Sequence, residues 1–142
     1  MKWNQMIPEL DVFDLKTSLH FYVDLIGFSV EYERKEDCFA FLRLEKVQWM
    51  IQEIDPKNHL WETGTLEYPL GRGINFQIDV TNIEEIYQRL QEEKYPIFQE
   101  MEEHWYRREN VLMGCKEFLV QDPNGYLLRF SQDTKNKRIT SK

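Results

Sequence analysis

The chain has 142 residues, of which 42% are hydrophobic and 30% charged, typical of one globular domain or two fused half-domains. No apolar run approaches the roughly 20 residues that a membrane-spanning helix needs, so we expect no contact with a membrane interior. The net charge of −7 disfavours nucleic acid as a partner, because phosphate groups require a basic surface. Neutral or cationic partners are favoured instead.

The first ten residues, MKWNQMIPEL, lack the apolar stretch and the cleavage site of a secretory signal, so we expect a cytoplasmic protein. Cys38 and Cys115 have no CxxC spacing, which argues against a disulfide framework and against a thiolate metal site. We predict two buried free thiols, the usual state of unpaired cysteines.

The first module, at about residues 5–54, has the order βαβββ. In IPELDVFD, residues 7–14, Leu10 and Val12 share one face, as a half-buried strand requires. Asp14 or Thr17 caps a helix that ends at Gly27. The apolar stripe of this helix consists of Leu15, Leu19, Tyr22 and Ile26. Three strand candidates follow: FSVEYERK, CFAFLRLE and VQWMIQE.

The same order repeats at about residues 73–132, after an aromatic linker at about residues 55–72. The strand INFQIDV precedes a helix capped by Asn82, and the strands IFQEM, CKEFLVQ and YLLRFSQ follow it. The Asp-Pro-Asn-Gly sequence at 122–125 favours a tight hairpin between the last two strands. We expect residues 133–142 to form a solvated tail. The repeat predicts an α+β fold of two tandem βαβββ modules, with helices on one side of each sheet.

The other face of each sheet carries polar side chains and forms the candidate binding site. Carboxylates there meet cationic groups, amides donate and accept hydrogen bonds, and aromatic rings from loops stack on a ligand. The predicted ligand-binding residues are Glu9, Gln48, Met50, Trp61, Asn75, Gln77, Asp79, Trp105, Tyr106 and Arg129. The alternative is that these are ordinary solvent-exposed strand positions.

The stretch MEEHWYRREN, residues 101–110, places Trp105 and Tyr106 beside two arginines. Such a cluster can clamp a planar ligand by stacking and cation–π attraction. It is equally typical of a dimer interface, where Trp, Tyr and Arg are enriched, and plain packing is the third interpretation.

The spacing of histidines, carboxylates and known motifs along the sequence indicates no catalytic centre. The three histidines, His20, His59 and His104, are not spaced along the sequence as metal ligands usually are. If carboxylates held a metal instead, Glu9 and Asp79 would be the candidate pair. A GxSxG elbow and a glycine-rich phosphate loop are both absent from the sequence. We therefore predict no catalytic residue, no metal site and no cofactor.

Two segments carry a family resemblance: PELDVFDLKTSLHFYVDLIGF at 8–28 and CKEFLVQDPNGYLLRF at 115–130. With the repeat, they resemble the vicinal oxygen chelate superfamily of glyoxalase I, extradiol dioxygenases, fosfomycin-resistance enzymes and bleomycin-resistance proteins. By this resemblance, the first and fourth metal-ligand positions fall on Ile7 and Arg129, and the second and third fall near Met50 and Asn75. The usual ligands are missing, and the permanent charge of Arg129 would oppose a divalent ion.

The remaining features resemble the bleomycin-resistance branch, whose members lack the metal and hold a cationic antibiotic in clefts between the subunits of a homodimer. The resemblance implies a homodimer that binds a planar or cationic compound without catalysis. The alternative is a metal-dependent glyoxalase-like lyase or dioxygenase with a rearranged site. We expect Arg129 to pair with Glu9 or Asp79; receiving an anionic ligand group is its other possible role.

Overall fold

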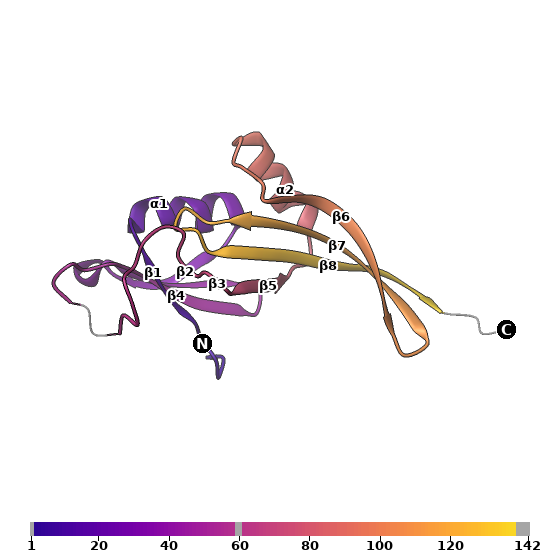
Figure 1. The fold of residues 1–142 in the computed structure, drawn as a ribbon, viewed down its shortest axis with the longest axis horizontal. Coiled ribbons are helices and arrows are strands. Elements are labelled where there is room, and N and C mark those ends of the chain that lie inside the picture. Colours follow the sequence, from indigo (N-terminus) through magenta and orange to yellow (C-terminus); the bar gives the residue numbers. More distant parts are fainter. Residues whose placement is uncertain (1, 59–60, 139–142) are drawn as a thin grey trace. The chain divides into compact units, whose positions relative to one another are not determined.

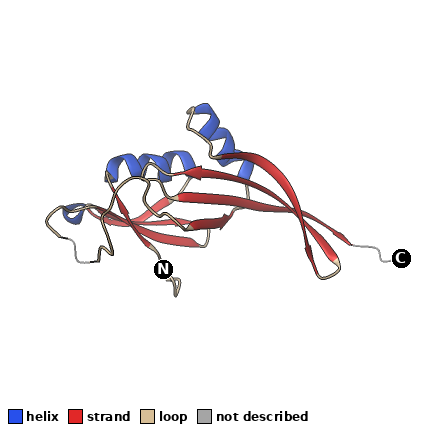
Figure 2. Ribbon diagram, in the orientation of Figure 1, coloured by secondary structure: helices blue, strands red, loops and turns tan. Residues whose placement is uncertain are grey.

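The computed structural model describes residues 2–58 and 61–138, which form two compact units (Figure 1). Unit 1 comprises Met1–Arg72 with Asp122–Tyr126, and unit 2 comprises Gly73–Gln121 with Leu127–Lys142. Each unit holds a four-stranded sheet with helical segments along one face (Figure 2). The α+β class with two repeated modules is therefore confirmed. None of the helices described is long and apolar enough to span a membrane.

Unit 1 is a mixed sheet with the strand order β1-β4-β3-β2. Its elements are β1 (Glu9–Val12), α1 (Leu15–Leu19), η1 (His20–Ile26), β2 (Ser29–Arg34), η2 (Lys35–Asp37), β3 (Phe39–Leu44) and β4 (Val47–Glu53). β1 runs parallel to β4, and the other neighbours are antiparallel. Leu10 and Val12 are buried as the alternation predicts, because they face the helical side of the sheet with Trp49 and Ile51.

The first helix begins where the sequence predicts, since the carboxylate of Asp14 accepts a hydrogen bond from the Thr17 backbone N–H at 2.9 Å. The expected continuous α-helix is wrong after Leu19, where the chain widens into the π-helical segment η1. Gly27 closes it with a φ of 110° and donates its N–H to the Tyr22 carbonyl, five residues back. A wider turn stacks positions four or five apart, so two adjacent pairs of apolar residues share the buried face. These are Phe21, Tyr22, Leu25 and Ile26.

Unit 2 repeats this arrangement with the strand order β5-β8-β7-β6 and a parallel β5–β8 pair. Its elements are β5 (Asn75–Asp79), α2 (Ile83–Glu92), β6 (Gln99–Arg108), β7 (Val111–Gln121) and β8 (Leu127–Arg138). Asn82 caps α2 as predicted and accepts a hydrogen bond from the Glu85 N–H at 3.3 Å. The helix covers a core in which Phe118 stacks on Phe130 at 5.3 Å.

The last three strands are longer than the sequence patterns indicate. β6 continues through the polar stretch to Arg108 and turns at Glu109, with a φ of 57°, into β7, as the long hairpin in Figure 1 shows. β8 follows β7 along its whole length, so Val111 is paired with Arg138. The prediction of a solvated tail from residue 133 is therefore wrong as far as Arg138, because the extended β7 supplies a partner for these backbone groups.

The connection between β7 and β8, Asp122–Tyr126, belongs to unit 1. Asp122 accepts a hydrogen bond from the Tyr22 hydroxyl at 2.6 Å, and Asn124 accepts one from the Phe13 backbone N–H at 2.8 Å. The Tyr126 hydroxyl donates to the Asp11 carbonyl at 2.9 Å. The predicted tight hairpin is therefore a longer loop, which is anchored by buried polar contacts.

Replacing Gly125 with alanine is expected to lower the free energy of unfolding by about 2 kcal/mol or more. Gly125 has a φ of 102°, and an added Cβ would lie 2.5 Å from the Cα of Pro69. Gly64→Ala is the matched control, because an added Cβ there meets no atom within 4 Å. Urea denaturation measures both variants, and equal midpoints would contradict the requirement for glycine at 125.

Candidate binding hollows

A hollow of about 640 Å³ lies on unit 1, and we call it the acidic hollow. Seven carboxylates line it: Glu9, Asp11, Glu36, Asp37, Glu53, Asp55 and Glu62. Among the described residues, no Lys, Arg or His side chain is part of the lining. Trp61 also lines the hollow and has 85% of its surface exposed. The arrangement therefore combines concentrated negative charge with an accessible aromatic ring.

Strand alternation places Glu9 and Asp11 on the same face of β1, away from the helical side. Partial desolvation raises the pKa of Glu9, and repulsion from Asp11 raises it further, with Arg34 opposing in part. Partial desolvation likewise raises the pKa of Asp11, with a further contribution from Glu62. These carboxylates therefore lack sufficient compensating charge from the protein.

A second hollow, of about 540 Å³, lies on the sheet face of unit 2 opposite α2, and we call it the mixed hollow. Its charged residues have both signs: Arg108 and Arg129 are cationic, whereas Asp79, Glu117 and Asp133 are acidic. His104 and Tyr106 from β6, with Met113 and Cys115 from β7, complete its main walls. Unlike the acidic hollow, this one offers partners to positive and negative groups.

Arg129 lies in a hydrogen-bond network on the floor of the mixed hollow. Its Nη2 donates to the Gln77 Oε1 at 2.8 Å, and the Gln77 amide nitrogen donates to Asp79 at 3.2 Å. The Ser131 hydroxyl also donates to Asp79. The nearest carboxylate pairing of Arg129 is with Glu117, at 4.0 Å. The expected pairing with Asp79 is therefore wrong, because Gln77 links the two residues by accepting from Arg129 and donating to the Asp79 Oδ1.

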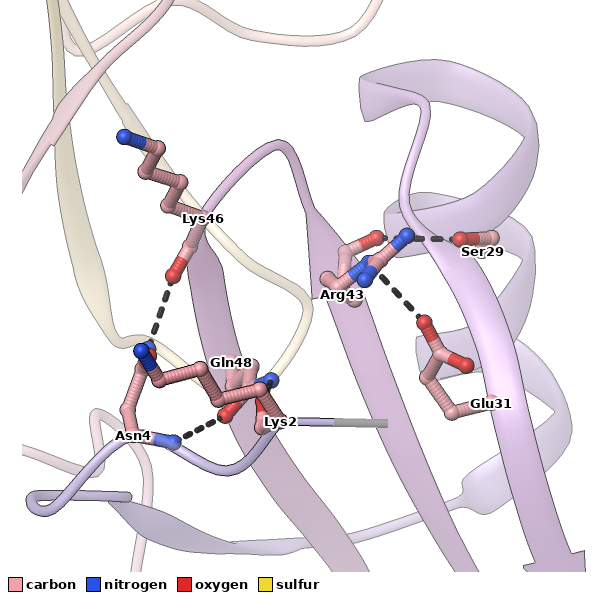
Figure 3. Close-up of polar contacts among 7 residues, drawn as sticks. All are labelled: Lys2, Asn4, Ser29, Glu31, Arg43, Lys46 and Gln48. Atoms are coloured by element: carbon pink, nitrogen blue, oxygen red, sulfur yellow. Dashed lines mark hydrogen bonds and ion pairs between the residues drawn. The ribbon is translucent and has the colours of Figure 1, made fainter.

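The sequence predicts that Gln48 faces an open cleft, but the structure places it elsewhere. It is buried, and its amide oxygen accepts a hydrogen bond from the Asn4 backbone N–H at 2.7 Å. Its amide nitrogen donates to the Lys2 carbonyl at 2.8 Å, so the amide holds the N-terminal segment against the sheet (Figure 3). The alternation of residues along β4 places Gln48 on the polar face of the sheet, as predicted. It does not indicate that the N-terminal backbone covers the side chain there.

Trp105 and Tyr106 do not form one clamp, because successive residues of β6 point to opposite sides of the sheet. Tyr106 lines the mixed hollow with His104 and Arg108, whereas Trp105 lies on the other face. The alternation from His104 to Arg108, followed by a turn at Glu109, was the signal for a strand.

The structure thus divides the remaining predicted residues between the two hollows. Glu9 and Trp61 line the acidic hollow, and Gln77, Asp79, Tyr106 and Arg129 line the mixed hollow. Met50 and Asn75 lie on the polar faces, beside Glu9 and Leu127 respectively, but outside both linings. Sequence reasoning missed the carboxylates that η2 and the start of the linker contribute to the acidic hollow. The signal that could have found them is the acidic residues of KED, residues 35–37, and EIDP, residues 53–56.

Cys38 is only half-buried and lines the acidic hollow, whereas Cys115 is buried as predicted. Both thiols are free. Desolvation raises the pKa of Cys38, and the negative charge of Glu53 adds to the effect. The thiol of Cys38 therefore stays protonated near neutral pH and is a poor nucleophile.

The family model of the Glyoxalase/Bleomycin resistance protein/Dioxygenase superfamily matches residues 8–130. The chain belongs to this superfamily. A superfamily member from Vibrio splendidus 12B01 is 41% identical, over 89% of this chain and 97% of its own, with a TM-score of 0.42. The bleomycin resistance protein of Geobacillus stearothermophilus is 28% identical, over 93% of this chain and 98% of its own. The fold is also similar to TioX from Micromonospora sp. ML1, at 18% identity and a TM-score of 0.67 over 93% and 100% of the two chains.

The superfamily's metal-ligand positions, as placed by the resemblance, do not fit a divalent ion in this chain. Ile7 and Met50 supply an alkyl group and a thioether, neither of which suits a hard cation. Asn75 lies opposite Leu127, while Arg129 lies opposite Gln77 and donates to its oxygen. Within residues 2–58 and 61–138, no group of three or more His, Cys, Asp or Glu side chains is arranged to hold a metal.

Proposed function

We propose that the protein binds a cationic organic compound of the bleomycin type in the acidic hollow and holds it without changing it chemically. The observation that carries the proposal is the set of seven carboxylates beside the exposed ring of Trp61. Desolvation and, after it, repulsion from Asp11 raise the pKa of Glu9, and a cation entering the hollow relieves that repulsion. The similarity to the bleomycin resistance protein of Geobacillus stearothermophilus supports the same class of ligand.

The aromatic ring adds a second source of affinity. A cation over an indole face contributes about 0.5–2 kcal/mol, depending on how far it is desolvated. A planar ligand group also stacks on the ring. The net charge of −7 favours the approach of a cationic ligand from solution.

The chemistry of Cys38, the thiol in the lining, supports sequestration rather than nucleophilic catalysis. Its raised pKa suppresses the thiolate form. Mass spectrometry of bleomycin recovered after incubation with the protein is expected to show the unmodified compound. A covalently altered product, or stoichiometric metal with activity after purification without chelators, would instead favour the lyase or dioxygenase alternative.

We further propose that the protein acts as a homodimer in the cytoplasm, as the resemblance to the bleomycin-resistance branch implies. Light scattering coupled to size exclusion is expected to give twice the chain mass of 17.4 kDa. A stable monomer at micromolar protein would contradict this assembly without affecting the charge argument for the hollow.

Bleomycin is expected to quench tryptophan fluorescence with a dissociation constant of about 1 μM or tighter. Trp61→Leu should remove most of the quenching and weaken binding by about 10-fold, because the exposed indole is lost from the hollow. Trp105→Leu is the matched control, since Trp105 is also exposed but lies in unit 2, outside the acidic hollow. No quenching at high micromolar ligand, or equal losses in both variants, would overturn the proposal.

A further inference from the structure

The guanidinium of Arg129 has donors that the protein does not satisfy. Its Nε is buried without a hydrogen-bond partner among the described residues. Its Nη1 lies 4.0 Å from Glu117, too far for a hydrogen bond, while the side chain as a whole stays 37% exposed. An unsatisfied buried donor reduces stability, which lowers the net contribution of this arginine to the fold.

The guanidinium is nevertheless held in a fixed orientation. Gln77 accepts from Nη2 at 2.8 Å, and its own amide nitrogen is fixed by Asp79, which Ser131 also contacts. Arg129 lines the hollow together with Glu117, and its Nη1 lies 4.0 Å from the Glu117 carboxylate. A preorganised cation next to a carboxylate is an arrangement suited to binding rather than to folding.

The surroundings restrict which ligand fits. A simple anion would meet Arg129 but also the charges of Asp79, Glu117 and Asp133. A simple cation would be repelled by Arg129 and Arg108. A molecule with adjacent positive and negative groups finds a partner for each. The cavity of about 540 Å³ lies within the range of about 300–1,000 Å³ that is usual for small-molecule sites.

We propose that the mixed hollow is a second binding site, which takes a small zwitterion with an amino and a carboxylate group on one carbon. The carboxylate accepts from Arg129 Nη1, and the ammonium group donates to Glu117. An apolar or aromatic side group lies against Tyr106 and Met113, which line the same hollow. The site lies within unit 2 and does not depend on the function proposed for the acidic hollow.

Three probes with the same ring and chain test the charge requirement: L-phenylalanine, 3-phenylpropanoate and 2-phenylethylamine. Calorimetric titration is expected to show L-phenylalanine binding at least about 10-fold more tightly than either probe with a single charge, because each lacks one ionic partner. In ¹⁵N spectra, L-phenylalanine should shift the Arg129 Nε–H signal and the amide signals of β5 and β8. Comparable affinity for all three, no binding of L-phenylalanine, or shifts confined to unit 1 would overturn the proposal.

Arg129→Met separates a binding role from a structural one. The variant is expected to keep or raise the melting temperature, because the unsatisfied donor is removed, while losing L-phenylalanine binding. Arg107→Met is the control, since Arg107 lies one residue from Arg108 on the opposite face of β6. If Arg129→Met does not fold, Arg129→Lys serves instead and should bind L-phenylalanine more weakly at an unchanged melting temperature. Unchanged L-phenylalanine binding in either Arg129 variant would overturn the assignment.

Discussion

Asp122→Ala is expected to lower the free energy of unfolding by about 3–5 kcal/mol, because several buried donors lose their acceptor together. The carboxylate of Asp122 accepts from the Tyr22 hydroxyl at 2.6 Å and from the Asn124 side chain at 3.0 Å. It also accepts from the backbone N–H groups of Asn124 and Tyr126, each at 2.9 Å. Alanine would leave these donors unpaired in an environment where Asp122 is 2% exposed. Urea denaturation measures the loss.

A graded pair of variants identifies the cause. Asp122→Asn keeps one oxygen for the two backbone donors and presents an amide nitrogen to Asn124, so its destabilisation should lie between those of the wild type and Asp122→Ala. Asp24→Ala is the control, because Asp24 is an exposed carboxylate whose ion-pair partner, His20, lies one helical turn away. This substitution should change the free energy of unfolding little. Equal stabilities of Asp122→Ala and Asp24→Ala would contradict the anchoring role of the turn.

The double variant Glu9→Gln with Asp11→Asn is expected to weaken bleomycin binding by at least about 10-fold, since two of the carboxylates that meet the cation become neutral. The same variant should be more stable than the wild type at pH 7. Both carboxyl groups have pKa values raised in the folded state, with desolvation as the main cause. Their charged forms therefore oppose folding, and the neutral amides remove that opposition.

The pH dependence gives this prediction a definite sign. A carboxyl group with a raised pKa in the folded state contributes stability below its unfolded pKa, and this contribution is lost as the pH rises through the folded pKa. The stabilisation by Glu9→Gln and Asp11→Asn should therefore be present at pH 7 and vanish below the ordinary pKa values of the two carboxyl groups, 4.5 and 3.8. Wild-type affinity for bleomycin should fall over the same acidic range.

Glu33→Gln is the control for this pair, because Glu33 is an exposed carboxylate of β2 outside the acidic hollow. It changes the net charge by one unit, half the change of the double variant, so its effect is compared with that of Glu9→Gln or Asp11→Asn alone. Denaturation at pH 7 and pH 3.5 and titration with bleomycin measure the effects. A loss of affinity as large for Glu33→Gln would show that net charge, rather than the hollow, attracts the ligand.

The helix starts and strand faces could be predicted because their signals are local. Asp14 and Asn82 cap their helices through hydrogen bonds three residues along the chain. The buried faces of β1 and β5 follow from alternation alone, with Val12 and Ile78 almost fully buried. Strand ends were harder to predict. β6 and β8 extend through polar residues because each pairs with β7, and the strand propensity of a segment does not depend on whether a partner strand is present.

The candidate site was harder to predict, since its parts are not neighbours in sequence. Glu9 and Trp61 were selected for their chemistry, but Glu36 and Glu62 reach the same hollow only through η2 and the linker. Gln48 was assigned to the site for its amide, which the N-terminal backbone occupies instead.

The sequence by itself determined the duplicated βαβββ order, the superfamily and the absence of the usual ligand types at the family positions, because period, turn residues and motif spacing are properties of short segments. The tertiary structure alone decided that carboxylates gather in unit 1 while Arg129 is paired with Gln77 in unit 2. Strand register and loop paths fix those encounters, and both depend on packing between segments far apart in the chain.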